Sequence, residues 1–401
     1  MKEAIIYLGC SYPQLPNIKA LRDFGIEVIG TDRENINSKT KSLLTEFHKI
    51  SATDINSLIK LTNELKKKYN LLFAYGIADF CYKSIGKIHK TIGDPKLPID
   101  YSNFFSKIKT SKILKSCKIP HAKLICYGQN IEDFVVNYEK VKYTGSSVLK
   151  IDSRNNSSGI HLFEETKIKN LLKSIKNSEY NGEKILLEEQ INNYSRILNL
   201  DGIVKNGKFF PIIFTSRLLD KNDKRRTLVM IQPAIDLKQD SKEVLIKYAN
   251  DLVKKMNYRF GAITIDIAEL DTGNFKVLEI SPHFHIISST IWIKKKSPLV
   301  DLIETSASIK NKYKCKSEKK VSSHIICYQV FSKNRINYKA WKKQISNLLI
   351  KGDIIYGYAI TSSQIMGDKF CIGLLWKHVS KREQIYSFMK EIDKKVIKLQ
   401  Y

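Results

Sequence analysis

The sequence predicts an α/β region with a parallel sheet, then a larger α+β region, then a small C-terminal α+β region. Strand and helix signals alternate over the first hundred residues, whereas hairpin signals with intervening helices follow in the middle of the chain. A length of 401 residues suits two or three domains. Polar stretches at 93–103 and 311–320 are typical of linkers. The predicted domains are residues 1–103, 104–312 and 321–401.

In the first region, short apolar runs at 4–9, 26–32 and 71–76 predict three strands. Residues 17–25 and 57–69 have the apolar periodicity of amphipathic helices. This alternation favours a doubly wound parallel sheet. The first strand is followed by GCSYPQLP and not by G-x-G-x-x-G, which disfavours an NAD-dependent dehydrogenase.

The middle region begins with a helix expected at 106–117. Apolar runs at 262–270 and 275–281 flank the turn DTGN, a pattern typical of a β-hairpin, and a predicted helix at 241–256 precedes them. Further strands are expected at 146–151, 160–163, 184–189, 196–204 and 208–214. The final region is expected to run strand, helix, strand, strand, helix. Hairpins with intervening helices indicate α+β structure for both regions.

The formal net charge of +28 comes almost entirely from lysine, because only ten of the 68 basic residues are arginine. A strongly basic chain suggests nucleic acid or an anionic membrane as a partner. However, the lysines are scattered over predicted amphipathic helices, and Ile and Asn are also abundant, which is typical of an AT-rich genome. We therefore expect a solvated surface and not a dedicated nucleic-acid face.

Membrane and secretory classes are disfavoured. No apolar run approaches the ~18 residues that a membrane span needs, and the N-terminus lacks the features of a signal peptide. The seven cysteines include no C-x-x-C pair, which disfavours zinc sites and disulfides and suits a reducing cytosol. A cytoplasmic location is expected.

Two lysines lie where phosphate groups could bind. Lys107 opens the helix at 106–117, although the helix dipole disfavours a cation there. Lys150 ends an apolar strand before the loop SRNNSSG, whose backbone amides can cradle a phosphate. Taken alone, each pattern is more common for a solvent-exposed lysine.

Two carboxylate features follow. Glu188 and Glu189 end an apolar strand and can accept hydrogen bonds from a ribose or an adenine amino group, although strand ends also simply meet solvent. Asp266 and Glu279 lie on the two strands of the predicted hairpin, where they could share one face and a divalent cation. Carboxylates among apolar strands are costly without a cation or donor, and Mg²⁺ with nucleotide phosphates would offset that cost.

The order and spacing of these features resemble the ATP-grasp superfamily over nearly the whole chain. The resemblance implies a Rossmann-like pre-ATP-grasp domain, a two-lobed ATP-grasp domain with a hinge near 187–191, and a small C-terminal α+β domain. It implies a ligase in which ATP phosphorylates a small-molecule carboxylate and an amine displaces phosphate from the acyl-phosphate, releasing ADP and phosphate. One or two Mg²⁺ ions are implied, with Mn²⁺ as a substitute, and a homodimer is compatible with the resemblance.

The resemblance also implies roles for individual residues. Those matching ATP-binding positions are Lys107, Lys150, Ser157, Ser158, Gly159, Leu187, Glu188, Glu189 and Ile191. Those matching metal-binding positions are Asp266, Glu279 and Ser281. Those implied for catalysis are Arg217, expected after the strand at 208–214, and His283. Arg226 is a further catalytic candidate from its own sequence context, a polar loop, because a guanidinium fork suits a carboxylate or phosphate of the substrate. An exposed loop arginine is the alternative at that position.

Two alternatives to the ligase stay open. Ser281 stands where the family has a metal-binding Asn, and His283 where it has an Arg, so a nucleotide-binding relative with weakened catalysis also fits. A basic nucleic-acid-binding protein is the other, and its binding would collapse steeply with salt. A zinc pair at His283 and His285 is disfavoured because no Cys or third His lies at a suitable spacing.

Overall fold

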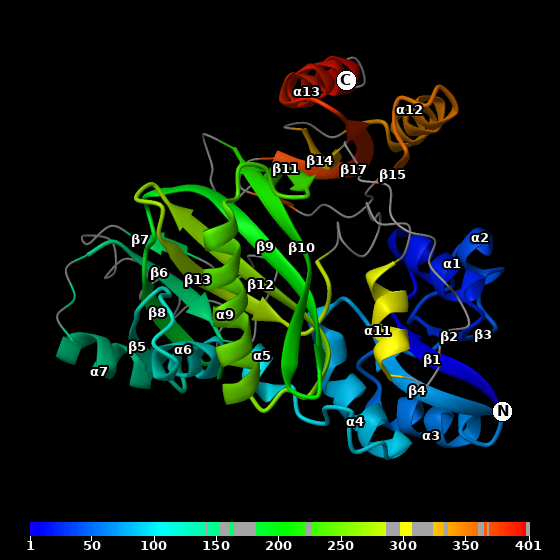
Figure 1. The fold of residues 1–401 in the computed structure, drawn as a ribbon, viewed down its shortest axis with the longest axis horizontal. Helices are drawn as coiled ribbons and strands as arrows, with labels where there is room; N and C mark the ends of the chain where they lie inside the picture. The colour runs from blue at the N-terminus through cyan, green and yellow to red at the C-terminus, as the bar shows by residue number, and fades with distance from the viewer. Residues whose placement is uncertain are drawn as a thin grey trace.

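Three β-sheets organise the protein in the computed structural model (Figure 1). The residues that it describes are 1–141, 143, 145–152, 161–163, 182–220, 227–285, 297–306, 324–332, 336–359, 365–366 and 369–397. The predicted linker at 311–320 lies outside these residues. Across the described ranges, no helix combines the length and the apolar character needed to cross a bilayer.

The N-terminal sheet is parallel throughout and has the order β3-β2-β1-β4. Its strands are β1 (Lys2–Leu8), β2 (Glu27–Thr31), β3 (Glu46–His48) and β4 (Tyr69–Tyr75). Its helical segments are η1 (Tyr12–Gln14), α1 (Leu15–Asp23), α2 (Ser38–Lys41), α3 (Ile55–Leu65), η2 (Asp79–Cys81) and α4 (Tyr82–Ile92). The central strands are buried, which explains why they are continuous apolar runs. The predicted α/β region with a parallel sheet is confirmed.

A small antiparallel sheet has the order β5-β8-β6-β7. Its strands are β5 (Leu124–Gly128), β6 (Ser147–Ile151), β7 (His161–Phe163) and β8 (Ile185–Glu189). The helices beside it are α5 (Ser102–Phe105), α6 (Lys107–Ser116) and α7 (Ile131–Val141). Phe134 of α7 packs with Leu149 and Leu187 in a small core of its own. This sheet forms one lobe of the middle region.

The large sheet is antiparallel and nine-stranded, with the order β13-β12-β9-β10-β11-β14-β17-β15 and β16 beside β17. Its strands are β9 (Tyr194–Lys205), β10 (Lys208–Leu219), β11 (Thr227–Gln232), β12 (Phe260–Leu270), β13 (Phe275–Ser281), β14 (His324–Ser332), β15 (Tyr356–Ala359), β16 (Ile365–Met366) and β17 (Lys369–Val379). The remaining helices are α9 (Gln239–Lys255), α11 (Pro298–Ser306), α12 (Tyr338–Ile350) and α13 (Arg382–Ile397). The predicted hairpin at DTGN is β12 and β13.

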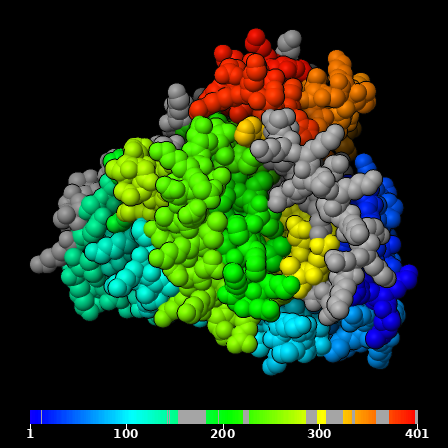
Figure 2. All heavy atoms as spheres, viewed as in Figure 1, coloured from blue at the N-terminus to red at the C-terminus, as the bar shows by residue number. Residues whose placement is uncertain are grey.

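The C-terminal region has the predicted α+β order with one short strand added, β16, and its strands continue the large sheet through pairing of β14 with β11. Figure 2 shows this region, in orange and red, gathered at one end of the molecule. β10 runs to Leu219, because it pairs with β9 as far as Arg217 and with β11 as far as Leu219. Arg217 therefore lies within a strand, and the expectation that it follows one is wrong. The strand was expected to end at Phe214, and β11 was not among the expected strands.

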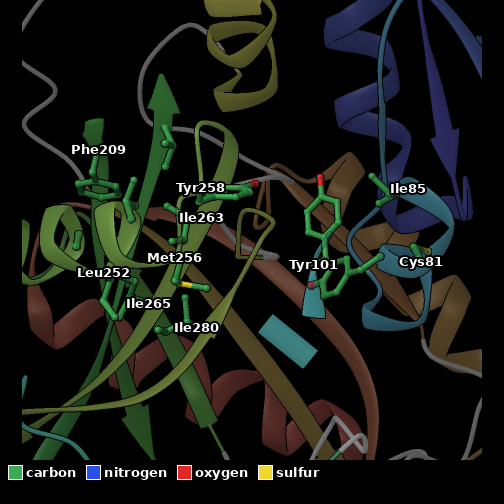
Figure 3. Packing of buried hydrophobic residues seen from close by; sticks show 14 of the residues in the cluster. Cys81, Ile85, Tyr101, Phe209, Leu252, Met256, Tyr258, Ile263, Ile265 and Ile280 are labelled. Atoms are coloured by element: carbon green, nitrogen blue, oxygen red, sulfur yellow. The ribbon is translucent and has the colours of Figure 1, made fainter. Parts of the chain in front are cut away.

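Two hydrophobic cores join the N-terminal region to the large sheet, and Tyr101 and Tyr258 belong to the larger one. Figure 3 places Tyr101 between Tyr258 on one side and Ile85 and Cys81 on the other. The rings of Tyr101 and Tyr258 meet edge to face with centroids 6.3 Å apart. Gly261 permits this packing, because a Cβ there would lie 2.0 Å from the Tyr258 hydroxyl and its φ is +137°. The shared core fixes where the N-terminal region lies against the sheet.

His89 links the segment after α4, through Pro98, to Ala74 of the N-terminal sheet. The side chain is 3% exposed, with Nε2 3.0 Å from the Ala74 amide nitrogen and Nδ1 2.9 Å from the Pro98 carbonyl oxygen. A neutral imidazole satisfies both contacts by accepting from the amide and donating to the carbonyl. Burial lowers the pKa of His89 to about 4.

We expect the free energy of unfolding to fall as the pH drops from about 6.5 to 4, because the unfolded chain takes up a proton that folded His89 resists. The contribution of this one group is about 3 kcal/mol, present above pH ~6.5. Denaturant titrations at several pH values should show a weaker pH dependence in His89→Gln. An unchanged dependence in that variant would contradict the assignment.

Candidate active site

Polar side chains line one face of the large sheet on four neighbouring strands. Asp266 of β12 lies opposite Asn199 of β9 and Glu279 of β13. Two positions along the same strands, Thr264 of β12 lies opposite Asp201 of β9 and Ser281 of β13. Because opposite residues and those two apart share a face, these side chains form one polar surface inside apolar strands. Its members are Asn199, Asp201, Thr215, Arg217, Thr264, Asp266, Glu279 and Ser281.

Asp266 is held by two donors. Arg217 Nη1 lies 2.9 Å from its Oδ2, and Asn199 Nδ2 donates to Oδ1. Burial nevertheless raises the pKa of Asp266 to about 6, with a further contribution from the nearby Glu279 charge. A cation beside this carboxylate would favour its ionised form.

The chemistry of this donor set fits Mg²⁺. Asp266 and Glu279 present carboxylates from directly paired positions, and Ser281 adds a hydroxyl two residues further along β13. Among the described residues, no group of three or more His, Cys, Asp or Glu side chains could hold a metal ion. Two carboxylates, completed by phosphate oxygens and water, are typical of a magnesium site and not of an all-protein cage.

Asp201 fixes the chain that follows β13. Its Oδ1 accepts a hydrogen bond from the His285 backbone nitrogen at 2.8 Å and another from Thr264 Oγ1. Burial lowers the pKa of His285 well below its ordinary value, with help from the neighbouring Arg217 charge, so its imidazole is neutral. His285 therefore adds no positive charge here, whereas the guanidinium of Arg217 is always charged and lies beside Asp266.

His283 faces the N-terminal region. Its Nδ1 lies 2.8 Å from the Phe284 carbonyl oxygen, and its Nε2 lies 3.9 Å from Oδ1 of Asp79 in η2. The His283 and Tyr82 rings also pack, with centroids 6.0 Å apart. His283 therefore lies between the end of β13 and the N-terminal region.

Lys150 and Glu188 form an ion pair on the small sheet. Lys150 lies opposite Leu186, and Glu188 lies opposite Val148, so the two charged side chains are diagonal neighbours on one face. Lys150 Nζ is 2.5 Å from Glu188 Oε2, and the side chains are 18% and 8% exposed. Leu187 points to the other face and is part of the small core.

A cleft between the two lobes brings the predicted residues together. Lys107, Lys150, Glu188 and Glu279 all line it. The residues that complete the lining are Phe104, Thr110, Ser111, Leu114, His121, Ala122, Val277, Leu278 and Ile280. Glu189 lies outside this lining and pairs with Lys276 of β13, and Ile191 follows β8 in a half-buried position. The candidate residues Ser157, Ser158, Gly159 and Arg226 fall outside the described residues.

Solved structures share this architecture over nearly the whole chain. An N5-carboxyaminoimidazole ribonucleotide synthetase in complex with ADP is similar with a TM-score of 0.71 at 14% identity, covering 98% of this chain and 96% of its own. An L-amino acid ligase from Bacillus licheniformis is similar with a TM-score of 0.73 at 13% identity, covering 98% of this chain and 97% of its own.

The chain has the ATP-grasp fold. A phosphoribosylglycinamide synthetase from Anaerococcus prevotii is also similar, with a TM-score of 0.63 at 14% identity, covering 100% of this chain and 99% of its own. The sequence itself matches no family model and no curated protein. The predicted fold is thus confirmed.

Sequence reasoning missed part of the polar surface of this ATP-grasp fold. Asn199, Asp201 and Thr264 were not among the candidates, although they surround Asp266 and the chain after β13. The signal was present as alternation, because L-N-L-D in β9 and I-T-I-D in β12 each put polar residues at every second position of an apolar strand.

The Lys150–Glu188 pair should be strongly coupled. Lys150→Met leaves a buried carboxylate without its cation and is expected to lower the free energy of unfolding by about 3 kcal/mol. Adding Glu188→Gln should restore most of that loss in a double-mutant cycle measured by denaturant titration. Lys19→Met, which breaks the exposed Lys19–Asp23 pair, is the control and should cost little. Additive effects at 150 and 188 would rule out the pair.

Proposed function

We propose that the protein is an ATP- and Mg²⁺-dependent ligase that joins a small-molecule carboxylate to an amine through an acyl-phosphate and releases ADP and phosphate. The observation that carries the proposal is the single cleft lined by Lys107, Lys150, Glu188 and Glu279. Lys107 of α6 and Lys150 of the small sheet therefore line the same cleft as a proposed metal-binding carboxylate of the large sheet. That arrangement suits a nucleotide whose phosphates bridge the lobes.

In the proposed reaction, Lys107 and Lys150 neutralise the phosphates of ATP. Lys150 exchanges its contact with Glu188 for a phosphate oxygen, which frees the Glu188 carboxylate to accept a hydrogen bond from the nucleoside. The strand end at Leu187, Glu188, Glu189 and Ile191 is the proposed hinge. The segment with Ser157, Ser158 and Gly159 is proposed to bind phosphate through its backbone amides.

Asp266, Glu279 and Ser281 would hold one or two Mg²⁺ ions, which neutralise charge on the transferring phosphoryl group when bound. Arg217 contacts Asp266 from β10, on the far side of β9, and is proposed to stabilise the carboxylate substrate or the acyl-phosphate. His283 and Arg226 are proposed to contact the substrate as further cations. Mn²⁺ is a proposed substitute for Mg²⁺.

The similar structures support the nucleotide and the reaction class. One was solved with ADP, and a carboxyaminoimidazole ribonucleotide synthase from Aspergillus clavatus was solved with ATP. We keep the boundaries 1–103, 104–312 and 321–401, the cytoplasmic location and a homodimer as parts of the proposal. The carboxylate and the amine stay unspecified, because loops and pocket shape select them.

Glu279→Gln tests the reaction directly. We expect ATP with Mg²⁺ to raise the melting temperature of the wild type, since a ligand of the native state stabilises it. The protein should then be assayed for ADP release with ATP, hydroxylamine and each member of a panel of carboxylates. We expect one carboxylate to stimulate ADP release and to be trapped as its hydroxamate. Glu279→Gln should lower that rate by orders of magnitude because it removes a charged ligand of a hard cation.

Asp271→Asn, an exposed acid in the turn between β12 and β13, is the control and should leave the rate unchanged. Near-normal ADP release by Glu279→Gln would contradict the assignment of the hairpin carboxylates as metal ligands. Nucleotide binding without ADP release over the whole panel would instead favour a relative with weakened catalysis. That alternative is suggested by Ser281 and His283, which stand where the family has Asn and Arg.

His283 gives a substitution test. His283→Ala should lower activity while ATP still shifts the melting temperature, because His283 is proposed to contact the substrate and not the nucleotide. His283→Arg, which keeps a cation at this position, should retain activity. Unchanged activity in His283→Ala would assign the cationic role to Arg217 or Arg226 alone.

A further inference from the structure

Asp152 makes a long-range contact beside both candidate phosphate-binding lysines. It follows β6 two residues after Lys150 and is 6% exposed. Its carboxylate accepts a hydrogen bond from Ser106 Oγ, at 2.8 Å to Oδ2, and another from the Ile108 backbone nitrogen, at 2.9 Å to Oδ1. Ser106 and Ile108 are the immediate neighbours of Lys107.

Helix α6 already has a local cap. Ser106 is its N-cap and accepts a hydrogen bond from the Lys109 backbone nitrogen at 3.2 Å. Asp152 therefore adds a second acceptor for the free N–H groups of the first turn, from a strand 44 residues away in the sequence. Its negative charge also offsets the helix dipole, which otherwise disfavours Lys107 at this position.

Hydrophobic packing does not join these two elements. Leu114 of α6 belongs to the core shared by the N-terminal region and the large sheet, whereas Leu149 and Ile151 of β6 belong to the small core. Within the described part of the chain, no residue of α6 belongs to the small core. The hydrogen bond from Lys112 to the Tyr127 hydroxyl also links α6 to the small sheet, but it is exposed. Asp152 is the buried polar link.

We propose that Asp152 is a positioning residue of the nucleotide site, which fixes Lys107 and Lys150 relative to each other so that both meet the phosphates of one ATP. The proposal rests on the proposed function, since it takes both lysines as ATP ligands. Two point charges on separate elements neutralise one phosphate chain only when their spacing is held, and small misplacements of such groups are costly.

The test compares three purified variants of the full chain. In Asp152→Ala, the dissociation constant of Mg-ATP measured by calorimetry should rise about 10- to 100-fold, and the KM for ATP should rise more than kcat falls. Asp54→Ala removes an ordinary N-cap, that of α3, where Asp54 accepts from the Ser57 nitrogen at 3.1 Å. Tyr127→Phe removes the exposed α6 contact. Both controls should bind ATP like the wild type.

A second measurement separates positioning from general stability. If Asp152 acts through the lysines, Asp152→Ala should weaken ATP binding much less in a Lys150→Ala background than in the wild type. Asp152→Asn, which keeps one acceptor, should give an intermediate affinity. Unchanged affinity in Asp152→Ala, additive losses with Lys150→Ala, or failure of both Asp152 variants to fold would each overturn the proposal. A wild type that binds no ATP would instead overturn the proposed function itself.

Discussion

Asp266 is a half-buried carboxylate among apolar strands, and the surrounding polar structure offsets the cost of placing it there. An ionised carboxylate is expensive to remove from water unless donors or a cation replace the lost hydration. Asn199 and Arg217 supply donors from β9 and β10, while desolvation and, to a lesser degree, the Glu279 charge on β13 raise the pKa of Asp266. The register of four strands is thereby tied to one acidic group. A sheet that slipped by one residue would turn all of these side chains to the other face.

The two walls of the cleft belong to different cores. Glu279 belongs to a strand of the large sheet, whose core is shared with the N-terminal region, while Lys150 and Glu188 lie on the small sheet. A ligand in the cleft would therefore contact two independently packed surfaces. Because apolar packing does not join these surfaces, polar contacts such as those of Asp152 help to set their relative position. The ion pair between Lys150 and Glu188 satisfies both charges before any ligand arrives.

The fold could be predicted where its signals are local. The turn DTGN between two apolar runs predicted the hairpin, whose register places Asp266 opposite Glu279. The strand that carries Lys150 was likewise expected from its apolar run. The contact of Asp152 was not expected, because it joins a helix 44 residues earlier in the chain. Arg217 was misplaced for a similar reason, since β10 is extended beyond its apolar run by pairing with β9 and β11. Positions decided by contact across distant segments leave no periodic trace.

The continuation of the large sheet into the C-terminal region has a consequence for synthesis of the protein. β11 pairs with β10 on one edge and with β14 on the other, and β14 begins at His324. Until that segment leaves the ribosome, the outer edge of β11 presents unpaired backbone groups flanked by Val229 and Ile231, which are fully buried in the finished protein. Exposed apolar edges of this kind promote pairing between nascent chains. A chain arrested before β14 would therefore expose this edge even though every residue that lines the cleft had already been synthesised.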